Sequence, residues 1–469
     1  MALPNTYHNV TKIADTLSGK RKLWFIGIGG VHMATMALFA SEKGYTVAGS
    51  DRTAGEGTAR LAAAGIPVYF GHDAARVVDA DAVIYTLAIS PDNPEYTAAK
   101  RLGLPLFSRA DFLAFLMRDH ALRIGVAGSH GKSTVTAMLA EIFTVAGRAP
   151  TVFCGAPLRG AVPFTGKGRD VIFEACEYED SFLRFSPTLA VILNVGLDHV
   201  DYFSSLDAVK ASFSRYAALP GKSGTVLCNA EDAAALSCVQ NSDARVHTFG
   251  VETGDYHASA LSFDEGKGRF IPVLPDGSRL GEIALRVVGR HNVANALAAL
   301  AVAHLCGDPE RAIQTGLSAF RGAGRRMEYR GMLRGARLFD DYAHHPAEIV
   351  ATISAAREIL CDKGRLFVVF QSHTYSRTAA FFGEICDALR EADRVLVAEI
   401  YAARENDTLG MSAAALAAGG GERASAPGNL SAIAATLSRE LEAGDLCIVM
   451  GAGDIDRLFA EIFTKPFTL

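Results

Sequence analysis

The 469-residue sequence lacks several features that mark specialised classes of protein. It has no uninterrupted apolar run of about 18 residues, the length that spans a bilayer, and residues 1–20 contain no apolar core of the signal-peptide type. We therefore expect a cytoplasmic protein with no membrane partner. The 8 cysteines include no Cys-x-x-Cys pair, and several stand in apolar runs. This pattern predicts buried free thiols in a reducing compartment.

The sequence also has little excess charge and neither internal repeats nor low-complexity tracts. A formal net charge of −5 at pH 7 gives no general attraction to nucleic acid, so we expect no nucleic-acid partner. Any anionic ligand must then be met by local basic groups. What is present is an ordinary globular composition, 49% hydrophobic and 21% charged, over a length that predicts two or three domains.

Short apolar strands alternate with helix-length stretches along the whole chain. Residues 22–28 and 45–49 are typical of strands, and residues 31–43 between them are typical of a helix. A second such block opens with the strand 123–127, and a third has strands at 338–340, 365–370, 394–398 and 446–451. This alternation predicts an α/β fold with mostly parallel sheets, in which ligands lie at the carboxyl ends of the strands.

The strongest motif is a glycine-rich loop between a predicted strand and a predicted helix. It reads Gly128-Ser129-His130-Gly131-Lys132-Ser133-Thr134. Backbone N–H groups at a helix start can surround phosphate oxygens, Lys132 adds a positive charge, and a hydroxyl can reach Mg²⁺. Val126 stands where the strict P-loop pattern has its first glycine. A plain turn is the alternative, but the strand–helix context favours phosphate binding.

A second glycine turn, Gly27-Ile28-Gly29-Gly30, follows the first predicted strand, and Ser50-Asp51 ends the next one. The turn is similar to a dinucleotide fingerprint, but His32 replaces the third glycine. The same geometry would hold any nucleotide diphosphate at the helix N-terminus. From this motif alone, an NAD-dependent oxidoreductase and a turn that binds nothing both stay open.

Two acidic clusters also follow predicted strands. Glu174 and Glu177 follow one strand, and Asp198-His199 follows the next. Carboxylates and an imidazole at neighbouring strand ends can hold the Mg²⁺ that bridges phosphates to an acceptor. Each cluster alone could be a solvated loop, but two clusters downstream of a phosphate loop favour the metal site.

Four further segments carry polar groups at the ends of predicted elements. They are Asn292 to Asn295 at the start of an Ala-rich helix, the basic turn Gly324-Arg325-Arg326, Asp340-Asp341-Tyr342-Ala343-His344-His345-Pro346, and Phe370-Gln371-Ser372-His373-Thr374-Tyr375-Ser376-Arg377. Each alone could be a capped helix start or a surface loop. Their order along the chain favours a functional interpretation.

Together these motifs resemble the Mur ligase family over nearly the whole chain, and its alanine-adding branch in particular. The resemblance implies an ATP- and Mg²⁺-dependent ligase of peptidoglycan precursor synthesis. Such an enzyme joins L-alanine to the carboxylate of UDP-N-acetylmuramate through an acyl phosphate. Three α/β domains are implied: a Rossmann-like UDP-sugar-binding domain (1–119), a central P-loop ATPase-type domain with a parallel or mixed sheet (120–324), and a Rossmann-like amino-acid-binding domain (325–469). We expect a monomer or a weak homodimer.

The resemblance also implies roles for individual residues. The implied catalytic residues are Lys132, Glu174, His199, Arg326 and Asp341. The implied ATP-binding residues are Gly128, Ser129, His130, Gly131, Lys132, Ser133, Thr134, Asn292, Asn295, Arg326, Asp341 and Tyr342. The UDP-sugar would be bound by Gly27, Gly29, Gly30, Ser50 and Asp51, the amino acid by His344, His373 and Arg377, and the metal by Ser133, Glu174 and His199.

The sequence departs from the family pattern at three places. Ser129 and Ser133 stand where Thr is usual, which keeps both hydroxyls, Cys176 and Tyr178 stand where Asp and Ser are typical, and the third place is the stretch ending in Arg404. Separately, Phe213 stands near the position where some relatives carry a carbamylated lysine. We therefore do not predict that modification. The stretch ending in Arg404 lacks the usual Pro and Gly, so a different amino acid or a preformed peptide stays the alternative substrate. An NAD-dependent oxidoreductase would leave the Lys132 loop unexplained.

Overall fold

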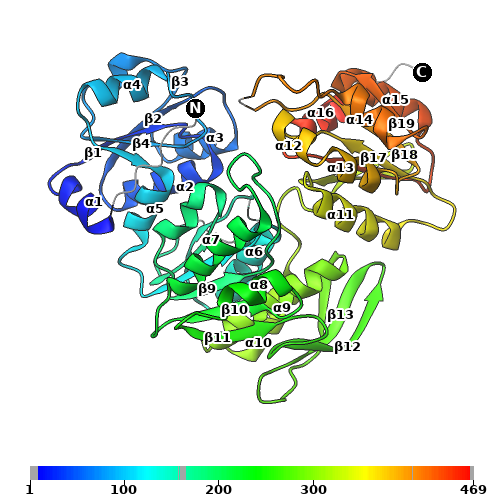
Figure 1. The fold of residues 1–469 in the computed structure, drawn as a ribbon, viewed down its shortest axis with the longest axis horizontal. Coiled ribbons are helices and arrows are strands. Elements are labelled where there is room, and N and C mark those ends of the chain that lie inside the picture. The colour runs from blue at the N-terminus through cyan, green and yellow to red at the C-terminus, as the bar shows by residue number, and fades with distance from the viewer. Residues whose placement is uncertain (1–8, 157, 159–164, 404, 465–469) are drawn as a thin grey trace. The chain divides into compact units, whose positions relative to one another are not determined.

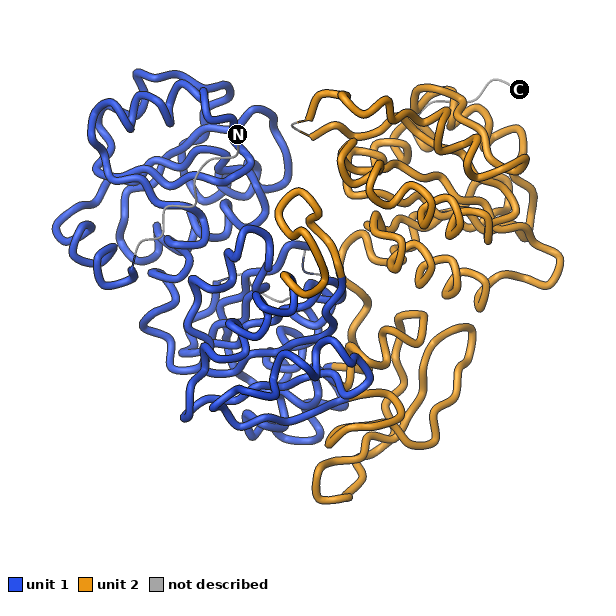
Figure 2. The backbone as a smooth tube through the Cα atoms, viewed as in Figure 1, with its two compact units in different colours: residues 1–196, 209–249, 298–316 blue, residues 197–208, 250–297, 317–469 orange. Residues whose placement is uncertain are grey.

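The computed structural model describes residues 9–156, 158, 165–403 and 405–464. The chain forms two compact units (Figure 2). Unit 1 comprises Met1–Gly196, Val209–Phe249 and Ala298–Gly316, and unit 2 comprises Leu197–Ala208, Gly250–Leu297 and Leu317–Leu469. The domain boundaries at 119/120 and 324/325 stay a prediction.

The first sheet of unit 1 is parallel, with the strand order β3-β2-β1-β4-β5 (Figure 1). Its strands are β1 (Lys22–Ile26), β2 (Thr46–Asp51), β3 (Val68–Phe70), β4 (Ala82–Tyr85) and β5 (Leu106–Ser108). The helices of this part are α1 (Val10–Leu17), α2 (Val31–Glu42), α3 (Glu56–Ala63), η1 (Ala74–Val77), α4 (Pro94–Arg101) and α5 (Arg109–Met117). The strand order reverses at β1, and such a reversal opens a ligand crevice at the carboxyl ends of the strands.

The second sheet of unit 1 is also parallel, in the order β11-β10-β9-β6-β8-β7. Its strands are β6 (Leu122–Ala127), β7 (Thr151–Phe153), β8 (Asp170–Glu174), β9 (Leu189–Ile192), β10 (Thr225–Asn229) and β11 (Arg245–Phe249), accompanied by α6 (Lys132–Val145), η2 (Tyr178–Arg184) and α8 (Ala233–Val239). Strand β6 is central and buried, and the phosphate loop follows it. Helices α7 (Leu206–Ala218), α9 (Arg290–Leu305) and α10 (Glu310–Ala319) each include residues of both units.

Unit 2 begins with a small antiparallel sheet of β12 (His257–Asp264), β13 (Lys267–Val273) and β14 (Ile283–Val288). These three strands were not predicted from the sequence. Side chains of β12 are half-buried or exposed along its whole length, so the strand has no continuous apolar run to reveal it.

The second sheet of unit 2 has the order β15-β16-β20-β17-β18-β19, in which only the β15–β16 pair is antiparallel. Its strands are β15 (Glu328–Leu333), β16 (Ala336–Asp341), β17 (Leu366–Phe370), β18 (Arg394–Ala398), β19 (Ala424–Gly428) and β20 (Leu446–Met450). Its helices are α11 (Pro346–Ile359), α12 (Tyr375–Ala380), α13 (Phe382–Leu389), α14 (Ala413–Gly420), α15 (Leu430–Glu440), η3 (Ile455–Arg457) and α16 (Leu458–Thr464).

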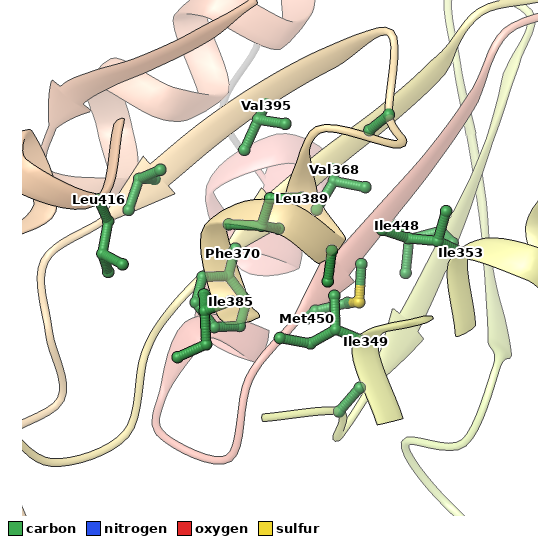
Figure 3. Close-up of a cluster of buried hydrophobic side chains, with 14 of the residues drawn as sticks. Ile349, Ile353, Val368, Phe370, Ile385, Leu389, Val395, Leu416, Ile448 and Met450 are labelled. Carbon is green, nitrogen blue, oxygen red and sulfur yellow. The ribbon is translucent and has the colours of Figure 1, made fainter. Parts of the chain in front are cut away.

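Helices cover both faces of this sheet, which explains its uninterrupted apolar strands. Val368 and Phe370 of β17 pack in one cluster with Ile349 of α11 and Ile385 of α13 (Figure 3). The alternate residues of the same strands, such as Val369, pack in a second cluster with side chains of α15 and α16. A strand that is buried on both faces cannot show the polar–apolar alternation of a half-exposed strand.

The prediction of buried thiols is confirmed for five cysteines, while Cys176 and Cys306 are partly buried. For Cys361 it is wrong, because that residue lies exposed just after α11, outside the apolar strands. Among the described residues, no helix is long and apolar enough to cross a membrane.

Candidate active site

The phosphate loop of unit 1 has a fixed backbone. Gly131 caps α6 in the left-handed region with φ of 84°. Gly128 has φ of 151°, and a Cβ there would lie 2.9 Å from the Leu193 Cβ, so only glycine fits without strain. The Asn194 side chain accepts from the His130 N–H at 2.8 Å and donates to the His130 carbonyl at 3.1 Å. The loop is therefore held from the end of the neighbouring strand β9.

Lys132 lies within this loop with its ammonium held between acceptors. Its Nζ donates to the carbonyls of Gly128 and of Ser129, the latter at 3.2 Å, and lies 3.1 Å from Glu177 Oε2. Burial opposes the charge, but the Glu177 carboxylate raises the pKa of Lys132 overall. Lys132 is therefore a permanent positive charge beside the helix start, where phosphate oxygens would bind.

Oxygen donors for a cation stand beside the loop. Ser133 is buried in the first turn of α6, where Thr134 is also buried, and Glu174 ends β8 and accepts a hydrogen bond from the Gly155 N–H. His199, predicted as the third metal residue, belongs to unit 2. Within the described part of the chain, no group of three or more His, Cys, Asp and Glu side chains forms a metal-binding cluster. The metal set stays a prediction.

The predicted UDP-sugar residues meet at the reversal of the first sheet. The N–H of Gly27 donates to the Ser50 carbonyl at 2.8 Å, and that of Gly29 donates to Asp51 Oδ2 at 2.8 Å. Gly30 begins α2 without a side-chain cap, which leaves the N–H groups of the first helical turn available to an anion.

The Ser50 hydroxyl forms hydrogen bonds with other side chains of the protein. It is fully buried, donates to Glu95 Oε2 and lies 3.0 Å from His72 Nδ1. Trp24 Nε1 donates to the same Glu95 oxygen at 3.2 Å. The carboxylate of Glu95 thus organises a buried network behind the glycine loop. The sequence interpretation missed Glu95 because it lies in a helix, 45 residues from Ser50.

In unit 2, Asp341 fixes the basic turn that precedes it. Its two carboxylate oxygens accept from the N–H groups of Met327 at 2.7 Å and Ala343 at 2.8 Å. Burial raises the pKa of Asp341. Both Arg325 and Met327 have positive φ, at 56° and 47°, so this carboxylate stabilises a strained turn. Asp341 acts on the shape of the turn that carries the basic residues.

Tyr342 and Arg326 lie together in the same region. The guanidinium groups of Arg325 and Arg326 each lie 5.2 Å from the centre of the Tyr342 ring. Arg326 Nη1 is 3.6 Å from Glu348 Oε1. The Tyr342 ring, predicted to bind ATP, therefore already has cationic neighbours, an arrangement that also suits polyphosphate.

The two predicted amides of α9 contact each other. Asn295 Nδ2 donates to Asn292 Oδ1 at 3.1 Å, and Asn292 Nδ2 donates to the Val288 carbonyl at 2.8 Å. His291 directly precedes Asn292, and burial and the charge of Arg326 lower its pKa to about 4. Both amides are buried, so their positions are fixed before any ligand binds.

The three predicted amino-acid residues come together in unit 2. Arg377 Nη1 lies 3.3 Å from His373 Nδ1, and the rings of His344 and His373 are 6.1 Å apart between centroids. His344 Nδ1 lies 2.9 Å from the Tyr342 carbonyl, which can only accept. Nδ1 therefore carries the proton, and Nε2 keeps its lone pair. Burial lowers the pKa of His344 to about 4, so the ring is neutral at pH 7.

Asp198 completes this cluster, although the sequence placed it in an acidic cluster beside the metal site and not with the amino-acid residues. Its Oδ1 accepts from Arg377 Nη2 at 2.8 Å and from the His199 N–H at 2.6 Å. His199 has φ of 51°, a strained conformation that the Asp198 carboxylate supports. Although burial opposes ionisation, His199 and Arg377 hold the pKa of Asp198 well below its usual range. The Asp-His pair in the sequence was the available signal.

Models of one protein family match the chain in three segments. They are described as "Mur ligase family, catalytic domain" over residues 22–121, "Mur ligase middle domain" over residues 126–303, and "Mur ligase, glutamate ligase domain" over residues 325–453. The chain belongs to the Mur ligase family.

Relatives within the Mur ligase family match over nearly the full length. UDP-N-acetylmuramate–L-alanine ligase of Clostridium tetani is 38% identical over 457 residues, which cover 96% of this chain and 99% of that protein. The ligase of the same name from Lachnospira eligens is 42% identical over 450 residues, covering 93% and 97%.

Solved structures of Mur ligases have the same architecture. UDP-N-acetylmuramate-alanine ligase MurC from Thermotoga maritima matches with a TM-score of 0.80 and 29% identity, covering 94% of this chain and 98% of that chain. The murein peptide ligase mpl of Psychrobacter arcticus matches with a TM-score of 0.71 at 22% identity, which shows the fold alone. The predicted fold class, three α/β domains of the Mur ligase type, is confirmed.

Two departures from the family pattern have different outcomes. Phe213 is fully buried, and its ring packs edge-on against Phe182 at 5.2 Å. This position is therefore part of the apolar core, as expected for a chain without the modified lysine. Arg404, which raised the alternative of another substrate, lies outside the described residues.

Proposed function

We propose that the chain is an ATP-dependent ligase that joins L-alanine to the carboxylate of UDP-N-acetylmuramate, a step of peptidoglycan precursor synthesis. The observation that carries the proposal is the cluster of Arg377, His373 and His344. It presents one fixed cation and one neutral imidazole to a small zwitterion. The names of relatives that cover nearly the whole chain support the same activity.

The phosphate end of the reaction is assigned to unit 1. ATP would lie on the loop Gly128–Thr134, with the Lys132 ammonium against its phosphates. The sugar-nucleotide carboxylate attacks the γ-phosphorus, an acyl phosphate forms, and ADP leaves. Lys132 is already charged beside the loop, so its field stabilises the charge that spreads over the moving phosphoryl group.

The amine end is assigned to unit 2. Arg377 binds the amino-acid carboxylate through the N–H groups that Asp198 does not use, since Nε and Nη2 already donate to Asp198 Oδ1. His344 Nε2 keeps a lone pair, so it accepts a hydrogen bond from the amine. The amine attacks the acyl carbon, the tetrahedral intermediate expels phosphate, and the amine loses a proton as the amide forms.

The residues around the loop fit Mg²⁺. Ser133 and Glu174 offer a hydroxyl and a carboxylate, the hard oxygen donors that this cation prefers. We propose that they hold it, with His199 as a further contributor. Mg²⁺ bound there would offset the negative charge of the phosphates.

The proposed substrates also bear on where the enzyme works in the cell. ATP and a nucleotide sugar are cytoplasmic metabolites, so we propose a cytoplasmic enzyme. We also propose that it works as a monomer or a weak homodimer. Sedimentation at micromolar concentration tests the second point.

Phosphate release with ATP, UDP-N-acetylmuramate and a panel of amino acids tests the proposed substrate. We expect the highest kcat/KM with L-alanine, and weaker reaction with glycine and L-serine, because one methylene or hydroxyl gives about 1–3 kcal/mol of discrimination. A higher kcat/KM with D-glutamate or a tripeptide would favour the alternative substrates. A melting temperature raised by NAD⁺ and not by ATP would favour an oxidoreductase.

A further inference from the structure

Two helices that start at the carboxyl edge of the first sheet of unit 1 are joined by a hydrogen-bonded Arg–His pair. His32 lies in the first turn of α2, where the dinucleotide fingerprint has a glycine, and Arg109 is the first residue of α5. Arg109 Nη1 donates to His32 Nδ1 at 2.9 Å. Neither side chain has a role in the mechanism above.

This Arg109–His32 pair has one buried donor without an acceptor. Since Nδ1 of His32 accepts from Arg109, its Nε2 carries the proton, and that atom is buried with no hydrogen-bond partner. Arg109 forms no ion pair with an Asp or Glu among the residues that the structure describes. Buried donors without acceptors are costly. A ligand that brings negatively charged oxygens would satisfy both groups at once.

The pair is within electrostatic range of the acidic residues at the end of β8. Burial and then the Arg109 charge lower the pKa of His32 to about 4, while Glu174 acts in the opposite direction. Arg109 also lowers the pKa of Cys176, although burial and Glu177 raise it overall. The positive charge of Arg109 thus acts on the segment that follows β8, where Cys176 lies.

We propose that Arg109 and His32 bind the carboxylate of the sugar nucleotide and position it for attack. The inference rests on the proposed function. A substrate carboxylate that approaches Glu174 and Glu177 is repelled by both, and the Lys132 ammonium is already engaged by Glu177. Arg109 supplies the compensating charge, and the neutral His32 ring supplies a second donor. Both are positioning residues.

The chemical consequence is selection between two nucleotide sugars. UDP-N-acetylmuramate differs from UDP-N-acetylglucosamine by an ether-linked lactyl group that carries the carboxylate. The Arg109–His32 pair recognises only the lactyl carboxylate. Removing the pair should therefore weaken the binding of UDP-N-acetylmuramate and leave the binding of UDP-N-acetylglucosamine unchanged.

Titration calorimetry with Arg109→Gln and three ligands tests the inference. We expect the Kd for UDP-N-acetylmuramate to rise about 10- to 100-fold, the loss of a charge-assisted contact. The Kd values for UDP and for UDP-N-acetylglucosamine should stay within about twofold of wild type. His32→Gly should shift the same ligand in the same direction by a smaller factor. The control is Arg118→Gln, at the other end of α5. It removes a positive charge of the same size and should change none of the three Kd values.

Steady-state kinetics give a second test of the proposed role of Arg109. Arg109→Gln should raise KM for the sugar nucleotide and leave KM for ATP unchanged, and Arg109→Lys should recover part of the loss. An equal loss for all three ligands would assign the pair to the diphosphate and overturn the proposal, as would unchanged binding in both variants. Failure of the proposed function would instead appear in the wild-type protein, as equal affinity for the two nucleotide sugars.

Discussion

Replacing Asp198 with Asn tests the ion pair that orders the amino-acid cluster. The carboxylate accepts from Arg377 at 2.8 Å and from the His199 N–H at 2.6 Å, and both partners of the ion pair are about one-tenth exposed, at 9% and 11%. Removing one partner of a buried pair costs about 3–5 kcal/mol. The amide oxygen of Asn keeps one hydrogen bond, so we expect a loss of about 2–4 kcal/mol in the free energy of unfolding at pH 7.

The pH dependence of this loss gives the sharper test. The folded-state pKa of Asp198 lies below its unfolded value of about 4. The stabilisation is therefore complete above that unfolded value and is lost as the pH falls below it. Urea unfolding of wild type and Asp198→Asn should differ most at pH 7 and converge progressively below pH 4.

A matched control uses an exposed ion pair of the same unit. Asp387 pairs with Arg390 on the surface of the chain, with 72% of the Asp387 side chain exposed. Asp387→Asn should lower the stability by less than about 1 kcal/mol. Equal effects of the two substitutions, or a difference for Asp198→Asn that does not change with pH, would refute the reasoning.

Three further predictions concern unit 1. Lys132→Ala should lower kcat at least about 10²-fold, measured by phosphate release below the temperature at which the variant unfolds, and near-normal turnover would exclude the loop assignment. Gly128→Ala should weaken binding of an ATP analogue in a fluorescence titration because its Cβ has no room, whereas Gly147→Ala, where nothing lies within 4 Å, should bind normally. Ser50→Ala should lower the free energy of unfolding in urea by about 1–3 kcal/mol, because Glu95 loses a buried donor. A changed KM for the sugar nucleotide without a loss of stability would instead place Ser50 at the ligand.

Much of the fold could be predicted because its signals are local. The apolar run at 123–127 and the glycines after it are contiguous in sequence, and they form β6 and the turn into α6, which begins at Lys132 as expected. The β12–β14 sheet could not be found in this way, because β12 has no buried side chain and β13 buries only every second residue, so neither strand has a continuous apolar run. Its formation depends on antiparallel pairing, which no single segment shows.

The site was predictable as a set of residues but not as a set of contacts. The pairs Lys132–Glu177 and Asp198–Arg377 join residues 45 and 179 positions apart, so only the folded chain shows them. Asp341 illustrates the difference, because its carboxylate accepts from two backbone N–H groups and shapes the basic turn. Arg109 followed a predicted strand and could have been noticed at the sheet edge.

Transfer of oxygen from the sugar-nucleotide carboxylate to phosphate tests the central claim most directly. UDP-N-acetylmuramate labelled with ¹⁸O in its carboxylate is incubated with the protein, ATP, Mg²⁺ and L-alanine, and the released phosphate is analysed by mass spectrometry. An acyl-phosphate ligase moves one carboxylate oxygen to phosphate at each turnover, so we predict that every phosphate released carries one oxygen from the carboxylate. Unlabelled phosphate would mean that ATP is hydrolysed by water and would contradict the account.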